Sequence, residues 1–177
     1  MALKLYSMSQ PLSYVTAQES MYSGLSIRGK SRMELITVSL PPDSGKEIGE
    51  CFKLLVSRFS HWTNKWGKKT DVKFFKVEVK QGSNHHNHAL IVKPWLNPET
   101  LHRMWHEITG ADNTHVTCKT VSGDKKNRKV QKRLVQYLVN QGEHHAGAMV
   151  SFTRSDNWTA VSGERKVRKV IEGQKVL

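Results

Sequence analysis

Apolar residues recur along this chain with two different periods. Alternation of apolar and polar residues is typical of half-buried strands, whereas apolar residues spaced three and four apart are typical of amphipathic helices. The alternating pattern predicts strands in residues 33–40, 115–121 and 148–158, and a pair of strands within residues 71–94. The helical pattern predicts helices in residues 48–67, 97–110 and 128–141, and a capping box at Ser44–Glu47 precedes the first of them.

The order of these elements indicates the fold class. Strand, helix, strand, strand, helix, strand, helix, strand predicts an α+β domain with an antiparallel sheet and helices on one side, which is a ferredoxin-like or RRM-like arrangement. Residues 1–32 are weakly periodic, and we interpret them as a loosely ordered N-terminal arm or a peripheral strand. Residues 33–160 would then form one domain, followed by a basic C-terminal tail in residues 161–177.

The hairpin predicted within residues 71–94 carries the first candidate chemistry. Apolar residues alternate on one face of its first strand, so Glu78 points to the other face. The spacing of His86 and His88 places both imidazoles on one face of the second strand. A carboxylate and two neutral imidazoles from adjacent strands form a three-ligand set that leaves positions open on a divalent cation. The alternative is a polar hairpin end with solvated histidines, and we interpret three further histidines as solvated loop residues: His85, His144 and His145.

Composition and charge narrow the class of protein. The chain has 177 residues, with 28 Lys and Arg against 15 Asp and Glu, and its formal net charge is +13. Such an excess favours a polyanionic partner, and nucleic acid is the first candidate. No apolar run approaches the ~20 residues that span a bilayer, so we expect no membrane partner. The N-terminus lacks the apolar core of a signal peptide, and Cys51 and Cys118 form no CxxC pair, so we expect a cytoplasmic protein.

Tyr137 is the second candidate for chemistry. It lies on the apolar side of the helix predicted in residues 128–141, one turn after Leu134, and would face the sheet. One interpretation is a core tyrosine with a hydrogen-bonded hydroxyl. The other is a nucleophile that attacks a phosphodiester, with a divalent metal compensating for the phenol pKa of about 10.

The order of these motifs resembles the rolling-circle replication initiators (Rep proteins) of the HUH endonuclease superfamily. LITVSL resembles the family's first strand, and FFKVEV resembles the strand with the carboxylate. HNHALIV stands in the place of the His-hydrophobic-His motif, and VQYLVNQ in the place of the tyrosine motif. WHEITG and SFTRSDNW also follow the family pattern, so the resemblance covers residues 33–158. It implies a small antiparallel sheet with flanking helices, the HUH endonuclease fold.

The resemblance also implies roles for residues at the matching positions. His86, His88 and Glu78 would ligate a divalent metal, Mg²⁺ or Mn²⁺. Tyr137 would attack single-stranded DNA at a replication origin, leaving a 5′-phosphotyrosine link and a free 3′-OH. Because the link keeps the energy of the phosphodiester, the same site could later rejoin the strand.

Two positions depart from the family pattern. Asn87 stands where the family prefers an apolar residue. Asn140 stands where the tyrosine motif usually carries a lysine, so Lys132, Arg133 or another cation would take over the positioning of the phosphate. The candidate DNA-binding residues on this helix are therefore Lys129, Lys132, Arg133 and Asn140.

The expected function is a metal-dependent, site-specific single-stranded DNA endonuclease and ligase that starts rolling-circle replication of a plasmid or virus in a prokaryotic host cell. The chain contains no GxxxxGK[ST] phosphate loop, so we expect a separate host helicase to unwind the DNA and a separate polymerase to extend it. A transposase or relaxase of the same fold is one alternative. Another is a non-catalytic basic protein that binds single-stranded nucleic acid in a salt-dependent way, without cutting it or becoming attached to it.

Overall fold

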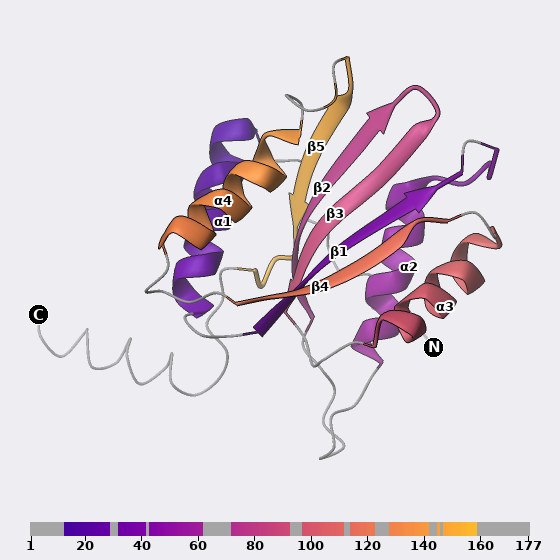
Figure 1. The fold of residues 1–177 in the computed structure, drawn as a ribbon, viewed down its shortest axis with the longest axis horizontal. Coiled ribbons are helices and arrows are strands. Elements are labelled where there is room, and N and C mark those ends of the chain that lie inside the picture. The colour runs from indigo at the N-terminus through magenta and orange to yellow at the C-terminus, as the bar shows by residue number, and fades with distance from the viewer. Residues whose placement is uncertain are drawn as a thin grey trace, which may run out of the picture.

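The computed structural model describes residues 13–28, 32–41, 43–61, 72–92, 97–111, 114–122, 128–141, 145 and 147–158. Three predicted features lie outside these residues: the part of the first predicted helix beyond residue 61, the loop residue His144, and the basic tail in residues 161–177. The described helices are α1 (Tyr14–Arg28), α2 (Ile48–Ser60), α3 (Pro98–Thr109) and α4 (Arg128–Val139). The described strands are β1 (Arg32–Leu40), β2 (Lys73–Gln81), β3 (Asn84–Val92), β4 (Val116–Ser122) and β5 (Met149–Arg154) (Figure 1). No helix in this part of the chain is long and apolar enough to cross a membrane.

The five strands form one sheet in the order β4-β1-β3-β2-β5. β1 pairs with β3 and β4, β2 pairs with β3 and β5, and every pair is antiparallel. The predicted α+β class with an antiparallel sheet is therefore confirmed. The segment from β1 to β4 has the element order βαββαβ, which is compatible with a ferredoxin-like arrangement.

Helices cover both faces of the sheet, so the prediction of helices on one side is wrong. α2 and α3 pack on one face, whereas α1 and α4 pack on the other (Figure 1). The reason lies in the topology, because β4 and β5 occupy opposite edges of the sheet. The chain between them passes over the face that the crossover helices α2 and α3 leave free, and α4 forms on that path. We call these the α2–α3 face and the α1–α4 face.

The prediction of a loosely ordered arm or strand at the N-terminus is wrong for residues 14–28, which form α1. The helix packs on α4 and β5 through residues spaced along one side: Ala17, Met21 and Leu25. Gly24 lies against the Trp158 indole, because a Cβ atom there would come within 2.3 Å of the ring. The Trp158 Nε1–H donates to the Ser20 carbonyl at 3.0 Å. Packing against a distant tryptophan through small residues produces no clear amphipathic pattern, which is why the sequence did not predict this helix.

The ends of the other helices test the predicted caps. The start of α3 is confirmed, because the Asn97 side chain accepts a hydrogen bond from the Glu99 N–H at 2.9 Å. Its end is also confirmed, because Gly110 caps it with φ of 67°. The capping box before α2 is wrong: Glu47 is the N-cap residue and makes no side-chain cap bond. The Ser44 hydroxyl instead accepts from the Lys46 N–H in the preceding turn.

Candidate functional site

The α1–α4 face changes from apolar to polar halfway along its central strands. The register pairs residues of like character across β1 and β3: Leu35 with Leu90, Thr37 with His88, and Ser39 with His86. The apolar half contributes to the core under α1 and α4. The polar half lies beyond the end of α4 and stays open, because its side chains offer no apolar surface for a helix to cover.

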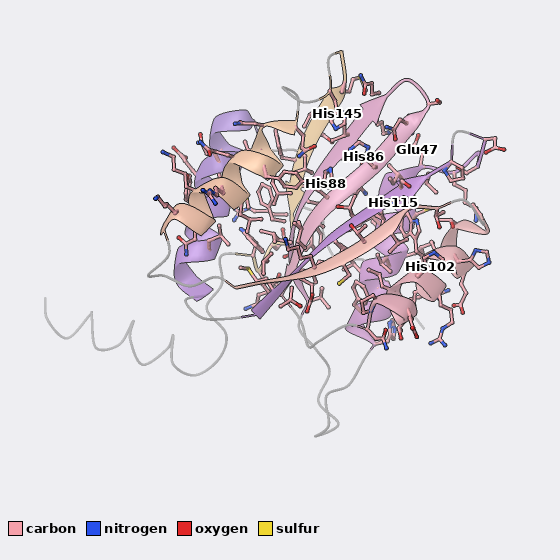
Figure 2. All side chains as sticks on the ribbon, in the orientation of Figure 1. Glu47, His86, His88, His102, His115 and His145 are labelled. Atoms are coloured by element: carbon pink, nitrogen blue, oxygen red, sulfur yellow. The ribbon has the colours of Figure 1, made fainter. Side chains whose placement is uncertain are left out.

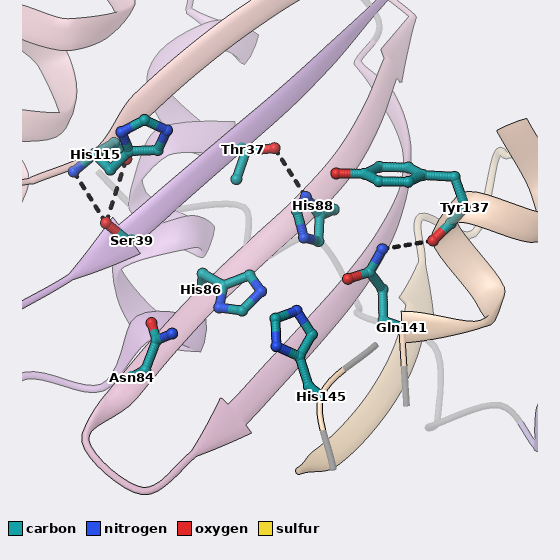
Figure 3. A pocket seen from close by; sticks show the side chains of 9 residues that line it. All are labelled: Thr37, Ser39, Asn84, His86, His88, His115, Tyr137, Gln141 and His145. Carbon is teal, nitrogen blue, oxygen red and sulfur yellow. Dashed lines mark hydrogen bonds between the residues drawn. The ribbon is translucent and has the colours of Figure 1, made fainter. Parts of the chain in front are cut away.

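This polar half forms one side of a pocket of about 510 Å³ (Figure 3). β1, β3, the residue before β4, and the C-terminal part of α4 with the segment after it all contribute to the pocket. The lining residues are Thr37, Ser39, Asn84, His86, His88, His115, Tyr137, Gln141 and His145. The structure therefore brings the predicted tyrosine and both predicted histidines to one place, although they are about 50 residues apart in the sequence.

Tyr137 faces the sheet as predicted, but it reaches the open half. Its side chain is 43% exposed, and its ring lies edge-on to the His88 ring with 5.4 Å between the centroids. No hydrogen bond to the Tyr137 hydroxyl is present within the described residues. The interpretation of a buried core tyrosine is therefore wrong, and the hydroxyl is accessible to a substrate in the pocket.

Three histidines gather beside Tyr137. The prediction that His86 and His88 face the same side of β3 is confirmed, with 4.9 Å between their ring centroids. His145 lies 5.1 Å from His86 on the same measure, so its interpretation as a solvated loop residue is wrong. Figure 3 shows the three rings turned toward a common space, with the side-chain oxygen of Gln141 at its edge. His85 faces away from this space and contacts the Gly82 carbonyl at 3.1 Å.

The surroundings hold the imidazoles of His86 and His88 in the neutral form. The pKa of His88 is lowered to about 4, mainly by burial and also by the nearby His86 and His145, while a hydrogen bond to Gln141 acts in the opposite direction. Burial also lowers the pKa of His86, with a further contribution from His145. Neutral imidazole is the form that ligates a metal, so both rings are ready for coordination at neutral pH.

Neighbouring side chains fix the orientation of the donors. Thr37 Oγ1 lies 2.8 Å from His88 Nδ1. In the tautomer with the ring proton on Nδ1, this N–H donates to the Thr37 hydroxyl and Nε2 keeps a lone pair for a metal. The Gln141 amide nitrogen donates to the Tyr137 carbonyl, which turns the amide oxygen toward the histidines (Figure 3). Within the described residues no group of three His, Cys, Asp or Glu side chains already stands in a ligating arrangement. A cation shared by these rings would therefore require them to turn from the positions described here.

Glu78 cannot complete this set, and its prediction as a metal ligand is wrong. In the register of the hairpin Val77 pairs with His88 and Val79 with His86, so Glu78 pairs with Asn87 and points to the α2–α3 face. There its carboxylate binds the Lys76 ammonium at 2.9 Å and the Lys80 ammonium at 3.4 Å. Asn87 is fully buried on the same face.

The predicted DNA-binding residues of α4 fall into two groups. Lys129 and Arg133 precede Tyr137 at intervals of four residues, so the three side chains form a stripe along one side of the helix. Lys132 is exposed but lies roughly 100° from the middle of this stripe, given the 100° that each residue turns. Asn140 is half-buried, and none of these four predicted residues lines the pocket.

Six residues of the pocket were not predicted as site residues from the sequence. They are Thr37, Ser39, Asn84, His115, Gln141 and His145. The spacing of Tyr137, Gln141 and His145 at four-residue intervals was a usable signal, because it indicates one side of a continuing helix. Thr37 and His115 carried no such signal, because only the pairing of β1 with its neighbours brings them to the pocket.

Figure 2 places this histidine group in the whole molecule: His86, His88 and His145 lie together on the open half, whereas His102 lies apart from them on α3. Comparison of the chain with protein-family models, with curated proteins and with solved structures finds no match. The chemistry of the pocket must therefore be argued from its own residues.

Proposed function

We propose that this protein is a metal-dependent endonuclease and strand transferase for single-stranded DNA, of the HUH type. The observation that carries the proposal is the accessible Tyr137 hydroxyl beside three clustered imidazoles in one pocket. The net charge of +13 supports a polyanionic substrate. The order of the sequence motifs supports a replication origin of a plasmid or virus as the target, in the cytoplasm of a prokaryotic host.

The donor atoms in the pocket fit a divalent cation. His86, His88 and His145 would supply three nitrogens, and Gln141 would supply an amide oxygen. A bound cation would draw charge from the non-bridging oxygens of the scissile phosphate. Imidazole nitrogen suits first-row transition ions, whereas Mg²⁺ prefers carboxylate, carbonyl and water oxygens. With Glu78 on the other face, this donor set fits Mn²⁺ better than Mg²⁺.

The reaction of Tyr137 is a transesterification at phosphorus. The tyrosine oxygen forms a bond to phosphorus, and the bond from phosphorus to the 3′ oxygen breaks. The phenol proton passes to solvent, and the departing 3′ oxygen takes a proton to become the 3′-OH. The segment that carries the 5′-phosphate is then attached to Tyr137, and the reverse reaction rejoins the two segments. A separate polymerase would extend the free 3′-OH, and a separate helicase would unwind the DNA.

The proposal is tested by trapping the covalent adduct. The protein is incubated with a pool of single-stranded oligonucleotides and Mn²⁺, and the products are separated on a denaturing gel. We expect a DNA-linked band with the wild type and with Tyr22→Phe, which alters a partly exposed tyrosine on α1. We expect no band with Tyr137→Phe or in EDTA, because the first lacks the nucleophilic oxygen and the second removes the cation.

Each departure from this result has a distinct meaning. An adduct that persists in Tyr137→Phe would show that another residue is the nucleophile. DNA binding without any adduct, even with the genuine origin, would support the non-catalytic binding protein instead. Sequencing the trapped DNA separates a replication origin from a transposon end or a transfer origin.

A further inference from the structure

The pocket extends beyond the histidines, across β1 to the edge strand β4. At this end it is lined by Ser39 and His115, which have no part in the cleavage chemistry described above. The backbone of His115 is held from both sides, because the Ser39 N–H donates to its carbonyl at 3.0 Å and its own N–H donates to the Ser39 hydroxyl at 2.9 Å. The imidazole itself is exposed. A residue with a firmly held backbone thus presents an exposed aromatic ring to the pocket.

Two further side chains continue this line along β4. Thr117 pairs with Thr37 and Lys119 pairs with Leu35, and both partners face the α1–α4 side. Thr117 and Lys119 therefore face the same side as His115, at intervals of about 6.8 Å along the strand. All three are exposed. Polar, ring-bearing and cationic groups thus follow one another along the open edge of the sheet.

The geometry of attack at phosphorus indicates which part of the DNA would lie at this edge of the sheet. In a displacement at phosphorus the attacking and leaving oxygens lie roughly in line on opposite sides of the phosphorus atom. Tyr137 enters the pocket from α4, and Figure 3 shows His115 at the opposite side, with His86 and His88 between them. A phosphate held beside the histidines and attacked by Tyr137 therefore directs its leaving 3′ oxygen toward β1 and β4.

The segment that leaves needs a binding site of its own. After cleavage the segment with the 5′-phosphate is attached to Tyr137, but the segment that ends in the 3′-OH is held only by non-covalent contacts. Rejoining requires the 3′-OH to stay beside the phosphotyrosine, because a positioned reactant replaces a bimolecular encounter. Within the described residues, the exposed side chains of His115 and Lys119 lie on the side of the pocket away from α4.

We propose that His115 and Lys119 form the subsite for the DNA segment that ends in the 3′-OH, a proposal that rests on the proposed function. The His115 ring contacts the terminal nucleotide by stacking on its base, and Lys119 contacts a phosphate farther along the segment. Both are positioning residues. They hold the segment in register for cleavage and keep it in place for rejoining.

The test compares the two halves of the cleaved DNA. The cut is first mapped from the trapped adduct, and fluorescein-labelled oligonucleotides are made for the 3′-OH half and for the other half. His115→Ala/Lys119→Ala should weaken binding of the 3′-OH half at least tenfold and leave the other half within twofold. A plot of the logarithm of the association constant against the logarithm of the salt concentration should become less steep by roughly 0.7, because one phosphate contact is lost. In a strand-transfer assay, the fraction of adduct that is rejoined should fall about tenfold, and Lys119→Arg alone should retain rejoining.

The matched control is His102→Ala/Arg103→Ala, which removes the same kinds of side chain from exposed positions on α3, away from the pocket (Figure 2). Equal weakening of both halves, or the same loss in the control, would overturn the subsite and leave only a general effect of charge. A wild-type protein that forms no adduct would overturn the proposed function and with it the link to the 3′-OH. In that case a random 20-nucleotide pool decides whether β4 binds DNA: unchanged binding by His115→Ala/Lys119→Ala would remove the subsite altogether.

Discussion

The two faces of the sheet are made by alternate residues of the same strands, yet they end differently. On the α2–α3 face, the apolar residues of β1 continue to the end of the strand at Leu40. On the α1–α4 face, apolar residues stop at Leu35, and Thr37 and Ser39 follow. One face is therefore closed along its length, and the other is closed over half and open over half. The site occupies the open half of a sheet whose other face is fully packed.

The polar residues of the two faces differ in what they interact with. On the closed face the carboxylates of Glu34 and Glu78 have partners inside the protein, because Glu34 accepts from Thr120 at 3.0 Å and Glu78 binds Lys76 at 2.9 Å. On the open face the histidines are oriented by neighbours but direct donor atoms into the pocket. Buried polar groups with partners contribute to the fold, whereas oriented groups facing a pocket are available for a ligand. Each of the following substitutions acts mainly on one face.

The largest effect should come from His86→Ala on the open face. Losing a metal ligand should remove about 4 kcal/mol of transition-state stabilisation, which corresponds to a loss of about 10³-fold in adduct formation. The control is His85→Ala, which removes the preceding histidine on the same strand, directed to the other face. Its cleavage rate should stay within a few-fold of the wild type. Similar losses in both variants would mean that the open face has no special part in the reaction.

Glu78→Gln should have the next largest effect, on stability and not on cleavage. The carboxylate and the Lys76 ammonium are mostly buried, so leaving the ammonium without its partner should cost about 3 kcal/mol in the free energy of unfolding at pH 7. The rate of adduct formation per folded molecule should stay unchanged. Urea unfolding followed by circular dichroism measures the first quantity, and the trapping assay measures the second. A large loss of cleavage in a folded variant would restore Glu78 as a candidate ligand.

The pH dependence of this variant has a definite sign. Burial raises the pKa of Glu78, but the charges and hydrogen bonds of Lys76 and Lys80 outweigh it, and the pKa lies below its ordinary value. The ionised carboxylate therefore stabilises the fold above the unfolded-state pKa of about 4.3. This contribution is lost as the pH falls through the lower folded-state pKa. The stability difference between wild type and Glu78→Gln should shrink over that range.

The contrast between Glu78 and His86 shows what the sequence could predict and what it could not. Alternation correctly placed His86 and His88 on one face of their strand, because the period of a strand is a local property. Which residues of β2 lie beside these histidines depends on the register of the hairpin. A shift of the register by one residue would have placed Glu78 on the same face as the histidines. The sequence carried the turn residues but did not fix where pairing begins. The α+β class was predictable for the same local reasons, whereas the second helical layer depended on contacts such as that of Gly24 with Trp158.

Thr37→Val should have a smaller effect, confined to the open face. The substitution keeps the size of the side chain and removes the hydroxyl that lies 2.8 Å from His88 Nδ1. Loss of a hydrogen bond that orients a metal ligand typically costs 10- to 100-fold in metal affinity or activity. The concentration of Mn²⁺ that gives half-maximal adduct formation should rise by about that factor, and Thr37→Ser should restore the wild-type value. If Thr37→Val needs no more Mn²⁺ than the wild type, Thr37 does not orient His88.

The smallest expected effect is on the ratio of the rates in Mn²⁺ and Mg²⁺. This ratio depends only on the donor atoms of the open face. Three imidazoles and an amide oxygen lack the carboxylate that Mg²⁺ prefers, so adduct formation should be about tenfold faster in Mn²⁺ than in Mg²⁺ at equal concentration. His145→Asp replaces one imidazole by a carboxylate at the edge of the pocket and should reduce this preference. Initial rates of trapping in the two metals measure the ratio for both proteins. An equal rate in Mg²⁺ and Mn²⁺ for the wild type would indicate that carboxylate or water oxygens, and not His145 and Gln141, complete the coordination.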